Sequence, residues 1–152
     1  MLKRLQKAAA MNGIMGIALS GAAVETRRID ASASNIANAR TTGRLPEAGP
    51  AGAADGARSP YVPVEATQGD IRGPEGQGAG VRGGVKPLST PLVAEYDPSS
   101  PDADAKGMVG VPNFDVGAEF GQQILGSRAY SANLSMARTS SDMMKDLLNM
   151  TA

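Results

Sequence analysis

The sequence predicts a mainly α-helical protein, with long N- and C-terminal helices packed as a coiled-coil-like hairpin and a Gly/Pro-rich middle segment that holds a few short β-strands. Two observations support this prediction. All ten prolines lie between Pro46 and Pro112, so both ends of the chain are free to form helices. Both ends also carry apolar residues at alternating spacings of three and four, which is typical of one helix packing on another.

The N-terminal helix of the core is expected over residues 11–43, after a flexible extension over residues 1–10. One stripe follows the helical repeat and comprises Met15, Leu19, Ala22, Thr26, Ile29, Ala33 and Ile36. Three glycines near its start each cost roughly 1 kcal/mol relative to alanine, so this helix needs a partner to be stable. Gly43 follows two threonines and supplies a C-terminal stop.

The C-terminal helix of the core is expected over residues 113–152, with Asn113 or Asp115 as its N-terminal cap. Its first stripe comprises Tyr130, Leu134, Ala137, Ser141, Met144 and Leu148. A second stripe on an adjacent face comprises Leu125, Ala129, Ala132, Met136, Met143, Leu147 and Met150. Because a two-helix hairpin buries one stripe per helix, the second stripe predicts a further partner.

The middle segment, residues 44–112, is expected to be a small hairpin-rich element. Pro46–Ala57 is an Ala/Gly/Pro tract of the kind found in loops. Tyr61–Thr67 and Leu92–Asp97 alternate apolar and polar residues, as strands with one buried face do. A proline near the start of each run restricts it to a sheet edge or a strand start.

The composition excludes several classes of function. The chain has no cysteine and no histidine, which rules out thiol catalysis, Cys/His zinc sites and Ser-His-Asp triads. Fifteen basic and fifteen acidic residues give a net charge of zero without a basic stripe, so no nucleic-acid partner is expected. Only three tyrosines and two phenylalanines are available for a core, so burial is expected to be completed against other chains.

Two short motifs resemble ligand sites by letter only. Gly78–Gly83 matches G-x-G-x-x-G, but it lacks the preceding buried strand and the following helix of a dinucleotide site, so we interpret it as a glycine-rich turn. Asp102–Gly107 resembles the start of a calcium loop, but Lys106 occupies a ligand position and the twelfth residue is Asn113. We therefore expect no enzyme activity, catalytic residue, cofactor, metal or small-molecule substrate.

Three stretches resemble the flagellar axial family, whose rod and hook proteins share similar terminal segments. Ser32–Thr42 (SASNIANARTT) is similar to the N-terminal signature of the family, and Ser127–Asn133 (SRAYSAN) is similar to its C-terminal signature. Tyr96–Asn113, with its YDP, PDAD and PN groups, resembles the central run of the proximal rod branch. The chain departs from that pattern at Met108, where the branch usually has tyrosine, and in apparently added residues at 1–10 and 48–58.

The resemblance implies a structural subunit of the bacterial flagellar basal-body rod. Such a subunit passes through the flagellar type III export channel without a cleaved signal peptide and polymerises through its terminal helices into the tubular drive shaft that spans the periplasm. Its partners would be other rod subunits, copies of itself, the basal-body ring and the export apparatus. Two alternatives stay open: another rod subunit of the same family, and a small helical adaptor or export chaperone that folds in isolation.

We expect the assembly and helix-packing contacts on the two terminal helices. The candidates are Met15, Leu19, Ala22, Ile29, Ala33, Asn35, Ile36, Asn38, Phe120, Ile124, Tyr130, Asn133, Leu134, Met136, Ala137, Met143, Met144, Leu147 and Leu148. The three asparagines fit subunit contacts and capping or solvated positions equally well. For Ile36 and Tyr130, contact within the hairpin core is favoured over contact between subunits.

Overall fold

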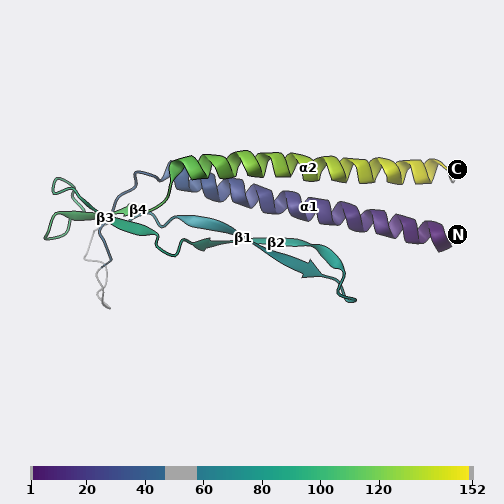
Figure 1. Cartoon of the computed structure of the whole chain (residues 1–152), viewed down its shortest axis with the longest axis horizontal. Helices are drawn as coiled ribbons and strands as arrows, with labels where there is room; N and C mark the ends of the chain where they lie inside the picture. The colour runs from purple at the N-terminus through teal and green to yellow at the C-terminus, as the bar shows by residue number, and fades with distance from the viewer. Residues whose placement is uncertain (1, 47–57, 151–152) are drawn as a thin grey trace. The chain divides into compact units, whose positions relative to one another are not determined.

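The computed structural model describes residues 2–46 and 58–150 and has a long helix at each end (Figure 1). The elements follow in the order α1 (Leu2–Ala37), β1 (Val64–Arg72), β2 (Gly78–Pro87), β3 (Leu92–Tyr96), β4 (Met108–Pro112) and α2 (Val116–Asn149). The predicted pair of terminal helices with short strands between them is confirmed. Most of the tract expected to be a loop, Pro46–Ala57, lies outside the described residues.

Local polar groups set the ends of both helices. The helix α1 begins at Leu2, within the segment expected to be an extension. At its other end, the Asn38 side-chain amide donates to the Ser34 carbonyl oxygen at 2.9 Å, which satisfies one of the free carbonyls of the last turn. The Gly117 amide donates to Asp115 Oδ1 at 2.7 Å, so Asp115, one of the two expected caps, begins α2.

The strands form two separate two-stranded sheets, one of β1 and β2 and one of β3 and β4. The tight turn between β1 and β2 is closed by a hydrogen bond of 2.8 Å from the Gly73 amide to the Gln77 carbonyl. In the second sheet the strands are antiparallel, with Val93 opposite Val111. The expectation that Gly78–Gly83 forms a turn is wrong, because these residues lie within β2.

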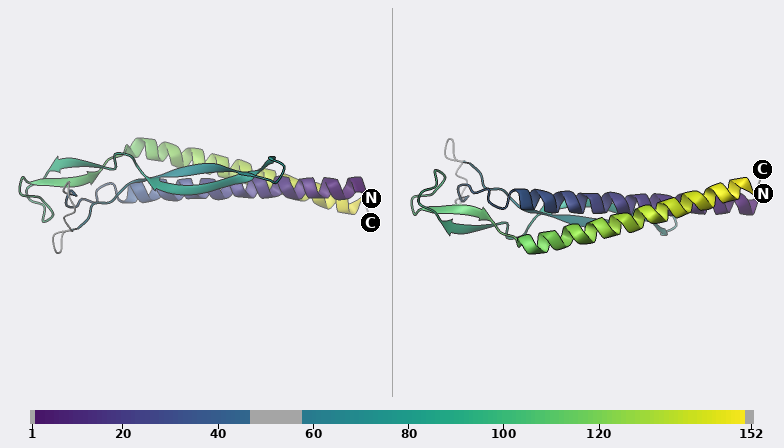
Figure 2. Two further views of the ribbon diagram at one scale, coloured as in Figure 1. Left: turned by 90° about the horizontal axis from the view of Figure 1, so that it is seen from below. Right: turned by 90° about the horizontal axis from the view of Figure 1, so that it is seen from above.

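The chain divides into two compact units. Unit 1 comprises Met1–Ile29, Ala66–Gly84 and Gln123–Ala152, and unit 2 comprises Asp30–Glu65 and Val85–Gln122. Within unit 1, α1 and α2 run side by side in opposite directions (Figures 1 and 2). The part of the β1–β2 sheet that belongs to this unit is Ala66–Gly84. The buried apolar residues of unit 1 are Met11, Ala18, Ala22, Val24 and Ala137.

Unit 2 contains the β3–β4 sheet and the adjoining ends of the two helices. Its buried side chains include Val109, at 1% exposure, together with Ala31 and Pro63. The backbone of Gly43 exchanges two hydrogen bonds with that of Gly110, at 3.1 and 2.7 Å, so the segment after α1 pairs with the edge of β4.

Candidate assembly surface

In unit 1 the two helices approach each other closely where one of them has a small residue. A methyl group built on Gly21 of α1 would lie 2.8 Å from Oδ1 of Asn133 on α2. A methyl group on Gly126 of α2 would lie 3.0 Å from Cγ1 of Ile29 on α1. Further along, the buried Ser140 hydroxyl donates to the Met11 carbonyl oxygen at 2.8 Å. The two close approaches at glycine and this hydrogen bond fix how the helices pair in unit 1.

At several points of α1 the buried residue is the one before the residue expected in the stripe. Ala22 is buried, and Met15 and Ile29 are partly buried, as members of that stripe. Leu19, however, is 48% exposed, and its neighbour Ala18 is buried at 6%. Because the helices approach closely around Gly21, small side chains fit between them where a leucine would not.

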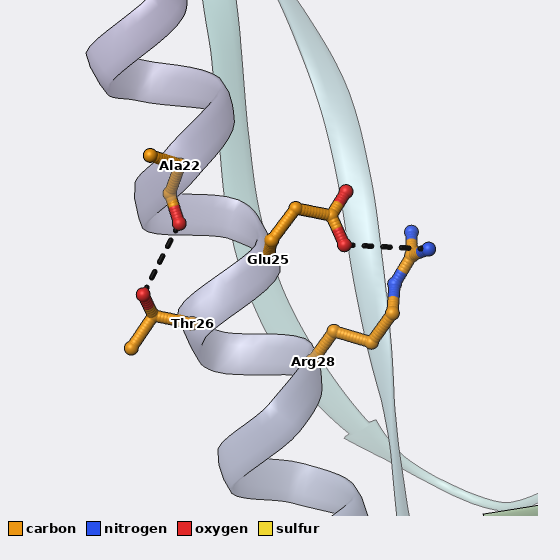
Figure 3. A network of polar contacts seen from close by, with 4 residues as sticks. All are labelled: Ala22, Glu25, Thr26 and Arg28. Carbon is orange, nitrogen blue, oxygen red and sulfur yellow. Dashed lines mark hydrogen bonds and ion pairs between the residues drawn. The ribbon is translucent and has the colours of Figure 1, made fainter. Parts of the chain in front are cut away.

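Glu25 is a buried acidic residue on this face, and the apolar pattern gave no sign of it. It is 8% exposed and forms an ion pair of 3.5 Å with Arg28 on the next turn (Figure 3). Its Oε2 atom makes no hydrogen bond within the described part of the chain. Nearby, the Thr26 hydroxyl donates to the Ala22 carbonyl at 3.1 Å, and the Thr26 side chain is exposed.

The strand β2 packs on a second face of α1 in unit 1. The Val81 amide donates to the Ser20 hydroxyl at 3.1 Å, and Arg27 Nη1 donates to the Gly83 carbonyl at 2.8 Å. Gly80 has a φ of 124°, and a methyl group there would lie 2.6 Å from the Ser20 hydroxyl oxygen. Glycine is therefore needed for both the backbone conformation and the close approach, which explains why a glycine-rich run forms a strand here.

In unit 2 a buried polar junction surrounds Asn35, which is 0% exposed. Its Nδ2 donates to the Val64 carbonyl at 2.7 Å, and its Oδ1 accepts from the Val64 amide at 3.0 Å. Nδ2 also donates to Glu119 Oε1 at 2.8 Å, while the Tyr61 hydroxyl donates to Oδ1 at 3.0 Å. One side chain thus joins the end of α1, the start of β1 and the first turn of α2.

Two serines extend this junction. The Ser32 hydroxyl, 2% exposed, donates to the Glu119 carbonyl at 2.8 Å, and the Ser34 hydroxyl lies 2.9 Å from that of Tyr61. Sequence reasoning missed Ser32 and Glu119 as partners because neither residue falls on the stripes that it followed. A signal was present, since Ala18, Glu25 and Ser32 recur every seven residues along the buried face of α1.

The remaining candidates divide between the inner and outer sides of the helices. Ala137 is buried, and those that are partly buried are Ile36, Asn38, Asn133, Leu134, Met144 and Leu147. Those that are exposed are Leu19, Ala33, Phe120, Ile124, Tyr130, Met136, Met143 and Leu148.

Four large side chains of the second stripe predicted for the C-terminal helix are exposed in unit 1. Leu125, Met136, Met143 and Met150 are 58%, 54%, 50% and 77% exposed. We call these four residues the outer stripe.

The acidic loop between β3 and β4 is a hydrogen-bonded turn. Asp104 Oδ1 accepts from the Lys106 amide at 2.7 Å and the Met108 amide at 2.9 Å. The Met108 amide, followed by the Lys106 amide, lowers the pKa of Asp104 below its ordinary value of 3.8. Among the described residues, no group of three His, Cys, Asp or Glu side chains is placed to hold a metal ion.

A small cavity of about 130 Å³ lies between the helices in unit 1 and is lined by residues that include Met11, Met15, Ser140 and Met144. It is smaller than the sites that hold drug-sized ligands, which measure about 300–1,000 Å³. No helix within the described ranges combines the length and the hydropathy needed to cross a membrane.

The chain is similar to proteins named flagellar basal-body rod protein FlgC. It is 33% identical to that of Salmonella typhimurium over 146 residues, which cover 93% of this chain and 98% of that protein. It is 34% identical to that of Agrobacterium fabrum over 137 residues, and 32% identical to that of Borreliella burgdorferi over 151 residues. Each of these covers 88% of this chain and at least 90% of the relative. No protein-family model matches the chain.

Proposed function

The chain belongs to the FlgC family of flagellar basal-body rod proteins, and from this premise we propose that it is a structural subunit of the proximal rod that polymerises through its terminal helices. The observation that carries this proposal is the outer stripe of α2. Leu125, Met136, Met143 and Met150 are each at least half exposed, although α2 already packs another face against α1 in unit 1. An exposed row of large apolar side chains is costly in water and is stabilised by a partner.

The helices are proposed to pair as a coiled-coil-like hairpin within the subunit. Support comes from the seven-residue recurrence of Ala18, Glu25 and Ser32 on α1 and from the opposite directions of the two helices. The buried members are small or polar, so the hairpin gains little from apolar burial on its own. Packing of the outer stripe against neighbouring subunits supplies the missing burial and offsets the entropy of ordering the helices.

The partners are proposed to be other rod subunits and further copies of this chain, with the basal-body ring and the export apparatus as additional contacts. We propose export through the flagellar channel without a cleaved signal peptide, because α1 runs without a break from Leu2 through Ser20–Ala23, the small residues at which a signal peptidase would cleave. The role needs no catalytic residue, in line with a chain that has neither cysteine nor histidine.

A deletion strain tests this function. Electron microscopy of its cell envelopes is expected to show basal-body rings without a complete rod, and the gene supplied in trans is expected to restore the rod. Complete basal bodies in the deletion strain, with no second copy of the gene, would overturn the proposal. Such a result would favour a helical adaptor or export chaperone.

A further inference from the structure

The seven methionines within the described residues differ strongly in exposure. Met136, Met143 and Met150 follow one another at intervals of seven in unit 1, and they are 54%, 50% and 77% exposed. The first two lie on α2, and Met150 directly follows it, with its amide still donating to the Asp146 carbonyl at 3.0 Å. Met11, in contrast, is 5% exposed. Met15, Met108 and Met144 are partly buried. Three of the four side chains of the outer stripe are therefore accessible thioethers on one side of one helix.

We infer that these three methionines form an oxidation site, at which hydrogen peroxide converts the outer stripe from an apolar to a polar surface. In each reaction a sulfur lone pair attacks one peroxide oxygen, the O–O bond breaks and an S–O bond forms. The sulfur loses two electrons, and the second oxygen leaves as water after a proton transfer. The product is a sulfoxide, which is polar and which methionine sulfoxide reductases convert back to the thioether.

The consequence for assembly rests on the proposed function. Leu125 is the one member of the outer stripe that peroxide does not oxidise. Three sulfoxides therefore remove most of the apolar surface of the outer stripe. A stripe packed between subunits is shielded from peroxide. Oxidation therefore acts on the subunit before it is incorporated and blocks its entry into the rod, while rods already built stay intact.

The first test measures the site itself on the purified full-length chain. The protein is exposed to graded hydrogen peroxide under native conditions, and each methionine is scored by peptide mass spectrometry for the gain of one oxygen. Met136, Met143 and Met150 are expected to be oxidised severalfold faster than Met11, with the partly buried methionines in between. Oxidation of Met11 at the rate of the three would overturn the inference. This result does not depend on whether the chain builds a rod.

The second test measures the consequence in cells. A strain carrying Met136→Leu, Met143→Leu and Met150→Leu keeps an apolar stripe without sulfur, and a matched strain carries Met11→Leu, Met15→Leu and Met144→Leu. Each strain is compared with its own rate of rod assembly before a peroxide pulse. After the pulse this rate is expected to fall to near zero in the wild type and in the matched strain and to stay unchanged in the first. Equal loss in all three strains would overturn the inference. Normal rods in a deletion strain would instead overturn the proposed function.

Discussion

The side-chain amide of Asn35 pairs with both backbone groups of Val64, accepting from its N–H at 3.0 Å and donating to its C=O at 2.7 Å. The side chain thereby occupies the place of a neighbouring strand at the start of β1. Because it also donates to Glu119 at 2.8 Å, it ties α2 to the same point in unit 2. Asn35 is the first of the two asparagines in the stretch that resembles the N-terminal family signature, and these contacts give it a physical role.

Asn35→Ala is expected to destabilise the chain by about 2 kcal/mol or more, because it removes a fully buried side chain and leaves partly buried groups of Val64 and Glu119 without partners. Denaturant unfolding followed by circular dichroism measures the change. The matched control is Asn38→Ala, which removes one partly buried capping bond and is expected to cost about 1 kcal/mol or less. Equal losses in the two variants would contradict the role assigned to Asn35.

Gly21→Ala is expected to destabilise the helix pair, although alanine is favoured over glycine in a helix by about 1 kcal/mol. The added methyl group would lie 2.8 Å from the Asn133 amide oxygen. Gly13 has no atom within 4 Å of a built methyl group, so Gly13→Ala is the control and is expected to stabilise.

A double-mutant cycle in thermal unfolding identifies the cause. Adding Asn133→Ala to Gly21→Ala removes the clashing side chain, so the pair is expected to be more stable than the sum of the single changes predicts. Additive effects would show that the two residues do not touch.

The loop between β3 and β4 is expected to lose its order in acid. The pKa of Asp104 is lowered in the folded state, so the carboxylate contributes stability that is present above the unfolded value and is lost as pH falls through the lowered folded value. The loss therefore occurs below the ordinary pKa of 3.8 and is absent near neutral pH. Amide exchange at Met108 and Lys106, measured by NMR across this range, is the readout, and Asp104→Asn is expected to abolish the pH dependence.

The sequence was sufficient to predict the two terminal helices, the strand near Leu92–Tyr96 and Asp115 as one of two candidate caps, because proline placement, alternation and capping are local signals. It was insufficient where tertiary contacts decide. Glu25 and Ser32 are buried although they are polar. Ser32 is small and donates to the Glu119 carbonyl, and Glu25 forms an ion pair with Arg28. The strand β2 was not predicted because two of its glycines, Gly80 and Gly83, are explained only by their close approach to α1.

Substitution of the outer stripe is expected to separate export from assembly. Met136→Asp or Met143→Asp places a charge where a neighbouring subunit is proposed to pack, so rods are expected to be absent while the subunit is still exported. Ser131→Asp, at an exposed position of α2 outside the stripe, is the control and is expected to leave swimming intact. Immunoblots of exported protein and motility in soft agar are the readouts, and normal swimming of both stripe variants would exclude this face as a subunit contact.

The most direct measurement of the central claim uses the absence of cysteine from the chain, which makes an introduced thiol unique. Met143→Cys is treated with a maleimide in the purified free subunit and in isolated basal bodies, and labelling is compared by mass spectrometry. The account predicts rapid labelling of the free subunit, because Met143 is 50% exposed, and protection in the assembled rod. Equal labelling in both states would contradict the claim that the outer stripe is buried between subunits.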